Sequence, residues 1–346
     1  MERNAKFDNV KFFLICCVVF GHIANSYAEN DFIMASMRFW IYLFHMPAFI
    51  FVAGLFSKRT IEENRWYKLV PYIFLFIMMK MNNYVLACIF AGINNASVDF
   101  FHEDGIPWFA LSMFWWGAIT ILVKRVKPLY VIVVSVLLAV VSGYSAGVNG
   151  FLVMQRTLVF FPFFYLGYLT DIDLLSSRLD RIHWKITSAV VLVATAVVVF
   201  LFYNDIYFWR FLFLGFEGYH AIHKGLPYAW GGTWRIIAYL ISMLLTLAII
   251  CLAPKKKSIL STIGRKTLPI FVFHQIIHRL AAYFIPGFRT WMLAGPTSLK
   301  CFGLMLVLVA LTSTPVFDLP LRKLMTVPLR PPSVPAEENS AQKPCE

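Results

Sequence analysis

Long apolar stretches recur along the whole chain, and the short connections between them carry most of the charged residues. An apolar run of about 20 residues is long enough to cross the hydrocarbon core of a bilayer as one helix. We therefore predict an all-α, polytopic integral membrane protein with about ten transmembrane helices. The predicted helices lie near residues 10–27, 38–56, 69–91, 107–123, 128–143, 151–169, 186–203, 235–253, 267–285 and 299–317.

The composition agrees with a membrane protein. Of the 346 residues, 60% are hydrophobic and only 14% are charged, and the mean hydropathy is +0.70, whereas soluble domains carry about 25% charged residues. The net charge of +13 comes from clusters of Lys and Arg between apolar runs, as in cytoplasmic loops. The chain is therefore expected to contact a lipid bilayer and no nucleic acid.

The basic clusters predict how the chain is oriented in the membrane. They lie in alternate connections, at residues 58–68, 124–127, 178–185 and 255–266. The positive-inside rule assigns these connections, and with them both termini, to the cytoplasm. Residues 1–323 are expected to form the membrane domain. Residues 324–346, rich in Pro and polar residues, are expected to form a disordered cytoplasmic tail.

The first predicted helix carries two ionisable residues, Lys11 and His22. Eleven residues correspond to about 16 Å of helical rise and to a rotation that returns to within about 20° of the same face. An ionisable group inside a bilayer is costly and usually faces a cavity or a partner. One alternative is a lysine that snorkels to the membrane surface and a histidine with a structural hydrogen bond.

Other predicted helices also carry polar residues at membrane depth. His45 lies about 10 Å into the second helix, and Arg156 begins the sixth near the same outer level. The ninth predicted helix contains three further polar residues, His274, His278 and Arg279. Such groups need partners or a water-filled cavity, and histidine suits proton transfer near neutral pH. The competing interpretation of each histidine is a satisfied packing residue.

The connection after the second predicted helix contains Arg65 and Lys68 beside Lys58 and Arg59. Clustered Lys and Arg suit phosphate, so this cluster predicts a clamp for a phosphorylated cosubstrate, although it also serves as a topology signal. Soluble nucleotide-binding motifs are missing from the sequence, as is the zinc motif HExxH. The six cysteines show no paired spacing, and no metal site is expected.

Several motifs along residues 7–317 occur in the order found in a known protein family. They are Asp8, Lys11 and His22; Phe44–Pro47 with Phe49 and Gly54; Arg65 and Lys68 before Pro71; Pro107–Leu111; Arg156–Tyr168; and Pro269–His274. With these motifs the chain resembles the membrane acyltransferase-3 proteins, and within them the fucose 4-O-acetylase-like branch. Lysine replaces the family's commoner arginine at positions 11 and 68, which gives up bidentate contacts.

The resemblance implies an O-acyltransferase, expected to transfer acetyl from cytoplasmic acetyl-CoA to a sugar hydroxyl of a surface polysaccharide or a lipid-linked glycan. Acetyl-CoA would be a cosubstrate, with no tightly bound cofactor, and the location would be a bacterial inner membrane. Lys11, Arg65 and Lys68 would hold CoA phosphates, and Lys11 also counts among the catalytic candidates.

In this interpretation His22 is the general base or a transient acyl carrier, and His45 and Arg156 position the acceptor or the acyl oxygen. The rival hypothesis is a transporter or flippase of a glycan-related solute. It explains the helix number and the buried polar residues equally well.

Overall fold

The computed structural model describes residues 4–28, 31–92, 97–102, 105–145, 150–221 and 227–326. These residues form α-helices and short 3-10 helices joined by connections. Within these ranges the one β pairing is an isolated bridge between His102 and Phe151. The first helices are α1 (Ala5–Tyr27), α2 (Phe32–Tyr42), α3 (His45–Glu62), α4 (Val70–Ala91), α5 (Trp108–Val123), α6 (Pro128–Ser142), α7 (Met154–Leu169) and α8 (Ile172–Leu179). They are followed by α9 (Ile182–Leu201), α10 (Tyr203–Ile206), α11 (Arg210–Leu214), α12 (Gly231–Leu252), α13 (Ile259–Gly264), α14 (Thr267–Phe284), α15 (Phe288–Leu293), α16 (Thr297–Thr312) and α17 (Pro315–Met325).

Each of the ten predicted segments contains a helix, so the all-α prediction is confirmed. Five helical segments of the described chain are long and apolar enough to cross a membrane: Ala5–Tyr27, Phe32–Glu62, Trp66–Phe90, Ile182–Leu201 and Tyr228–Leu252. Two bent pairs, α7 with α8 at 90° and α16 with α17 at 59°, raise this number to seven if each pair is one span. Length and composition thus support five to seven spans of the ten expected, and α5 and α6 are apolar but shorter.

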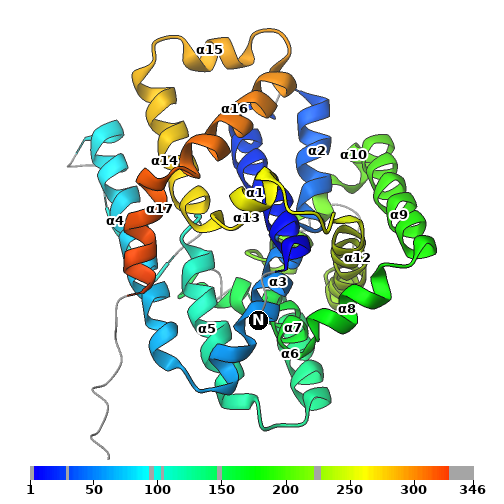
Figure 1. Ribbon diagram of the computed structural model, residues 1–346. Helices are drawn as coiled ribbons and strands as arrows, with labels where there is room; N and C mark the ends of the chain where they lie inside the picture. The colour runs from blue at the N-terminus through cyan, green and yellow to red at the C-terminus, as the bar shows by residue number, and fades with distance from the viewer. Residues whose placement is uncertain are drawn as a thin grey trace, which may run out of the picture.

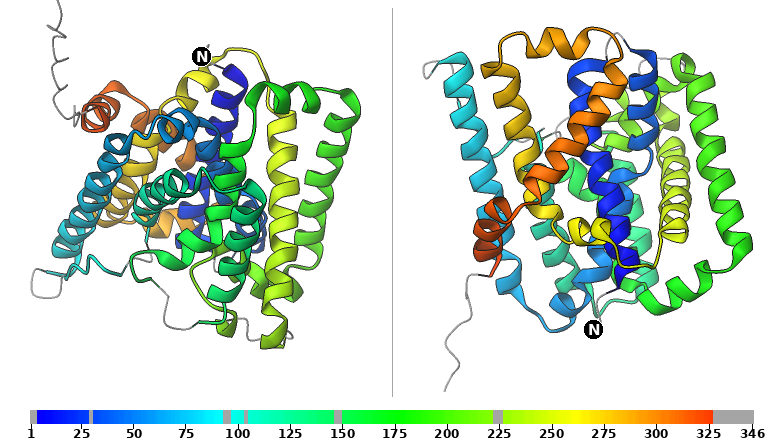
Figure 2. Two further views of the ribbon diagram at one scale, coloured as in Figure 1. Left: turned by 90° about the horizontal axis from the view of Figure 1, so that it is seen from below. Right: turned by 45° about the horizontal axis from the view of Figure 1, so that its top comes forward.

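Helix α1 runs through the middle of the helical bundle (Figures 1 and 2). In both figures α4, α14 and α17 lie on one side of α1, and α2, α9 and α12 lie on the other. The helix packs against α2, α3, α12, α13, α14 and α16, and most of its residues are buried. A central helix of this kind brings its polar residues to other helices instead of to lipid.

Helices α3 and α7 lie against each other with their backbones in close approach. A Cβ atom on Gly54 of α3 would collide with the carbonyl oxygen of Phe164, and one on Gly167 of α7 would collide with that of Phe51. Only glycine leaves room for such an approach, which is a common way for membrane helices to pack. This contact fixes α7, and therefore Arg156 near its start, relative to α3.

The second predicted helix differs from the expectation. It begins at Phe32 and is interrupted at Leu43 and Phe44, so that His45 starts a new helix. The physical reason is Pro47, whose ring would clash with the Leu43 carbonyl in a continuous helix and whose nitrogen cannot donate a hydrogen bond. By contrast, α7 continues through Pro162 without a break.

The N-terminal end of α1 is anchored to two connections. Lys6 Nζ lies 3.4 Å from Asp180, which also pairs with Lys255, and the Asn9 side chain donates hydrogen bonds to the backbone carbonyls of Pro254 and Lys256. Burial alone would raise the pKa of Asp180, but the Lys255 and Lys6 ammonium groups hold it below its ordinary value. Most of the predicted tail, residues 327–346, lies outside the described residues, and the first residues of that tail end α17.

Candidate functional site

Three of the four predicted catalytic residues line one cavity of about 370 Å³, which we call the histidine cavity. His22 comes from α1, His45 from α3 and Arg156 from α7. The other lining residues are Val18, Gly21, Asn25, Tyr42, Met46, Asn83, Gly105, Ile106, Trp108, Phe213, Leu214, Phe216, Gln275 and Arg279. The cavity is therefore built by helices from both halves of the chain, and its walls mix bases, amides and guanidinium groups.

The break between α2 and α3 determines how His45 is presented. As the first residue of α3, His45 is nearly buried, and its Nδ1 lies 3.0 Å from the Ile41 carbonyl oxygen. A carbonyl only accepts hydrogen bonds, so Nδ1 carries the proton and Nε2 keeps a basic lone pair. The ring stacks on Tyr42 at 5.1 Å between centroids, which fixes its orientation.

Arg156 sits between two aromatic rings at the start of α7. Its guanidinium carbon is 4.9 Å from the ring centroid of Trp108 and 5.0 Å from that of Phe216, and its Nη1 lies 3.5 Å from the Gly105 carbonyl oxygen. Stacking on aromatic faces is a typical way to hold a partly desolvated guanidinium. The side chain is 9% exposed and lines the histidine cavity, so it brings a positive charge to the wall of this space.

His274 of α14 lies directly behind His22. The two rings are 5.3 Å apart between centroids, and His274 is 1% exposed. Its Nδ1 lies 2.7 Å from the Ile270 carbonyl oxygen, so this ring too carries its proton on Nδ1. The sequence had marked His274 as polar but gave it no role.

Five polar cavity residues were likewise without a predicted role: Asn25, Tyr42, Asn83, Gln275 and Arg279. Of these, Arg279 stood out as a charged group in an apolar run, whereas nothing in the sequence marked Asn25, Gln275 or Tyr42.

A second cavity of about 320 Å³, here called the lysine cavity, lies toward the N-terminal end of α1. Lys11 and Lys68 line it, with residues of α3, α4, α5, α7 and α17. Lys11 Nζ is 2.6 Å from Asp8 and 5.0 Å from the ring centroid of Phe56. The structure thus brings together two of the three residues predicted to hold the donor.

Arg65, the third predicted donor ligand, is placed differently. It is not among the residues that line the lysine cavity, and its guanidinium pairs with Glu63. The guanidinium groups of Arg59 and Arg65 hold the pKa of Glu63 below its ordinary value. Part of the charge of Arg65 is therefore already balanced within the connection between α3 and α4.

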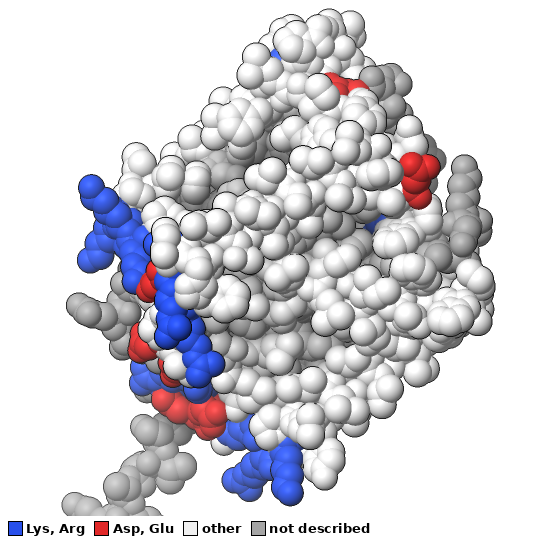
Figure 3. All heavy atoms as spheres, turned by 90° about the vertical axis from the view of Figure 1, so that its right-hand side faces the viewer, with Lys and Arg blue, Asp and Glu red and all other residues white. Residues whose placement is uncertain are grey.

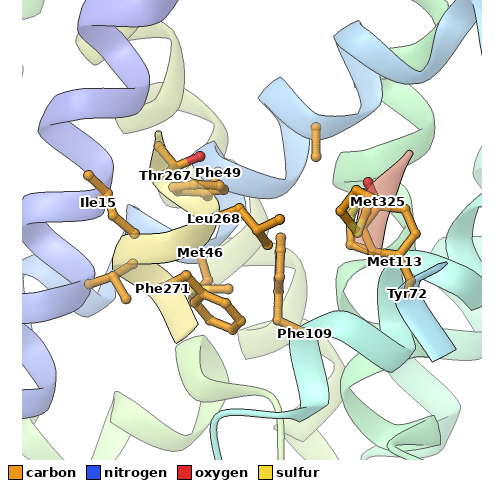
Figure 4. A pocket seen from close by; sticks show the side chains of 12 residues that line it. Ile15, Met46, Phe49, Tyr72, Phe109, Met113, Thr267, Leu268, Phe271 and Met325 are labelled. Carbon is orange, nitrogen blue, oxygen red and sulfur yellow. The ribbon is translucent and has the colours of Figure 1, made fainter. Parts of the chain in front are cut away.

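A third cavity of about 190 Å³ lies between the other two and has almost purely apolar walls (Figure 4). It shares Val18 and Met46 with the histidine cavity. It shares Phe49, Ala53, Tyr72, Met113 and Met325 with the lysine cavity. The three cavities therefore form a series beside α1, from two lysines through an apolar section to the histidines and Arg156.

The family of the chain follows from comparison with known proteins. A family model described as an acyltransferase domain matches residues 4–314, nearly the whole described chain. The chain belongs to the acyltransferase-3 family. It is therefore an integral membrane acyltransferase, and the enzyme class expected from the motifs is confirmed at this level. The rival transporter hypothesis is not favoured.

This acyltransferase-3 chain is also similar to the nodulation protein NolL of Sinorhizobium fredii (strain NBRC 101917 / NGR234). The two are 30% identical over 121 residues, which cover 31% of this chain and 33% of the relative. The chain thus matches about a third of that protein's length. No solved structure matches the chain.

Proposed function

We propose that this acyltransferase transfers an acetyl group from cytoplasmic acetyl-CoA to a sugar hydroxyl of a surface polysaccharide or lipid-linked glycan, as in the fucose 4-O-acetylase-like branch. The observation that carries the proposal is the series of three cavities beside α1. Ammonium groups at one end suit CoA phosphates, and bases at the other end suit a hydroxyl acceptor. Lys11 and His22 are separated by about 16 Å of helical rise, a distance that an extended pantetheine arm would bridge through the apolar section.

In the proposed reaction His22 removes the proton of the acceptor hydroxyl while the hydroxyl oxygen attacks the thioester carbonyl carbon. The new C–O bond gives a tetrahedral oxyanion, which the guanidinium of Arg156 stabilises. When the C–S bond breaks, the CoA thiolate leaves and takes the proton from the His22 imidazolium. The products are an acetyl ester and CoA thiol, and His22 returns to its neutral form. Transient acylation of His22 itself is the alternative course.

The other side chains receive roles from their positions. Nε2 of His45, which keeps its lone pair, would accept a hydrogen bond from the acceptor sugar. The lysines at the opposite end would hold the donor by its phosphates, Lys68 through its exposed side chain and Lys11 beside Asp8. The aromatic walls of the middle section would exclude water around the thioester and so disfavour its hydrolysis.

The test is a sidedness experiment with membrane vesicles that contain the full chain. Inverted vesicles should consume labelled acetyl-CoA added outside, transfer the label to glycan and release CoA on the side of addition. Right-side-out vesicles should leave the added donor intact, because the lysine end is predicted to be cytoplasmic. Donor consumption in right-side-out vesicles alone would reverse the proposed orientation. Solute accumulation without acetyl transfer in either orientation would contradict the proposed reaction.

A further inference from the structure

A fourth cavity of about 500 Å³ lies far from the α1 series, in a groove between α8, α9 and α12. We call it the α8–α9–α12 groove. It is lined by Leu175, Arg178, Leu179, Arg181, Trp184, Thr187, Ser188, Val191, Leu244, Leu247 and Ala248. The lining positions follow helical spacing on all three helices, so each helix turns one continuous face toward the groove.

The groove opens at the membrane surface on the predicted cytoplasmic side. Asp180, between α8 and α9, pairs with Lys6 at the N-terminal end of α1, which places the arginine end of the groove at that end of the bundle. Along α9, Ile186, Val190 and Val193 are all at least 60% exposed. Figure 3 shows Lys and Arg gathered along one edge of this side of the molecule, beside a broad surface without charge. This placement predicts that the groove lies at the depth where lipid headgroups meet acyl chains.

The groove combines two kinds of chemistry. Arg178 and Arg181 stand at its mouth, and within the described chain neither guanidinium has an ion-pair partner, because the nearby Asp180 is taken by two lysines. Trp184 lies one turn along α9, as tryptophan does at membrane interfaces. Deeper in the groove the walls are mainly aliphatic, with Val191, Leu244 and Leu247 among them.

We propose that this groove binds an anionic glycerophospholipid of the surrounding leaflet. Its phosphate would be held by Arg178 and Arg181, and one of its acyl chains would lie between α9 and α12. Basic pockets between membrane helices on the cytoplasmic side suit such headgroups. A small soluble anion would leave the aliphatic walls exposed, and a zwitterionic lipid would leave the two positive charges without balance. The site is separate from the proposed reaction and does not depend on it.

Native mass spectrometry of the purified full-length protein tests the site. The protein is released from nanodiscs of equal phosphatidylglycerol and phosphatidylcholine, and the retained lipids are counted. Removal of both guanidinium groups in the R178Q/R181Q double variant should reduce phosphatidylglycerol retention about 30-fold. The matched control is R125Q/K127Q, which removes the same charge from the exposed connection between α5 and α6 and should retain the lipid. Equal retention by the two double variants, or an equal loss in both, would overturn the proposal.

A second pair of variants tests the aliphatic part without a change of charge. Leu244→Trp adds bulk inside the groove, whereas Leu240→Trp adds the same bulk one turn earlier on α12, outside the lining residues. Both positions are at least half exposed, so neither change should prevent folding. The first variant should lose the retained lipid and the second should keep it. Displacement of the lipid by inorganic phosphate or CoA would contradict a lipid site and indicate a soluble anion.

Discussion

The imidazole rings of His22 and His274 lie 5.3 Å apart between centroids, although they belong to α1 and α14. The Nδ1 atom of His274 is committed to the Ile270 carbonyl, and its buried Nε2 has no hydrogen-bond partner within the described chain. This Nε2 atom of His274 can accept a hydrogen bond from the ring of His22, the proposed base, once that ring is protonated. We therefore expect His274 to act as a positioning residue for His22.

We predict that His274→Gln lowers kcat for acetyl transfer about tenfold while the KM for acetyl-CoA stays nearly constant, because the donor end of the cavity series is untouched. The matched control is His278→Gln, one turn further along α14, where the ring contacts the Tyr27 hydroxyl at 3.0 Å. This control should keep kcat close to that of the wild type. A parallel loss in both variants would indicate a general packing defect of α14.

The His22→Ala change should abolish acetyl transfer while the protein still inserts and is produced normally. A positioned general base contributes about 10²- to 10⁴-fold, so the loss of kcat should be at least 100-fold. Label transferred to glycan is the readout, and the amount of protein in the membrane is the control. Glycan acetylation at the wild-type level in well-expressed His22→Ala cells would exclude His22 from the chemistry.

Lys68 and Arg65 should respond differently to truncation, because only Lys68 lines the lysine cavity. Lys68→Ala should raise the KM for acetyl-CoA more than it lowers kcat, as loss of uniform binding does. Arg65→Ala should have a smaller effect, since Arg65 pairs with Glu63 in the neighbouring connection. Initial rates over a range of acetyl-CoA concentrations give the KM and kcat of each variant. An equal rise of KM in the two variants would place Arg65 in contact with the donor.

The sequence predicted the helices because their apolar runs are long, and it predicted His22, His45 and Arg156 because polar groups inside such runs are conspicuous. Their meeting in one cavity depends on how α1, α3 and α7 pack, which no local pattern reveals. Similarly, His274 was visible as a polar residue, but its position against His22 arises from the contact of α1 with α14.

Two features could not be predicted from apolar periodicity. The break before His45 depends on the position of Pro47 relative to a carbonyl four residues earlier, whereas Pro162 leaves α7 continuous. The ion pair of Arg65 with Glu63 reflects the turn between α3 and α4, so the basic cluster around Arg65 did not reveal which of its members reach the cavity.

Asp180 should make the stability of the protein depend on pH. Its pKa is below the ordinary value in the folded protein because of Lys255 and Lys6, although burial opposes this shift. A lowered folded-state pKa stabilises the fold above the unfolded pKa, and this contribution is lost as the pH falls through the folded-state pKa. Asp180→Asn should therefore lower Tm at pH 7 and make Tm less sensitive to acid. If Tm of the wild type and of Asp180→Asn fell in parallel between pH 7 and pH 3, Asp180 would not be the source of this pH dependence.

The apolar cavity between the lysines and the histidines should be the path of the donor arm. Ala53 lines both this cavity and the lysine cavity, so Ala53→Phe would fill part of a space of about 190 Å³. The variant should lose transfer at least tenfold, while free CoA should still protect Lys68 from chemical modification, because the proposed phosphate site lies at the lysine end of the cavity series. The control is Val193→Phe, which adds an aromatic ring on the exposed face of α9 and should leave transfer unchanged.

The two readouts of Ala53→Phe separate a blocked path from a lost binding site. Loss of both transfer and protection by CoA would mean that the substitution disturbs the lysine cavity itself. Wild-type transfer by a well-folded Ala53→Phe protein would show that the thioester reaches His22 by another route. In the expected case, with transfer lost and protection kept, the donor binds at the lysine end and its acyl group must pass Phe49 and Phe109 to reach the histidine cavity.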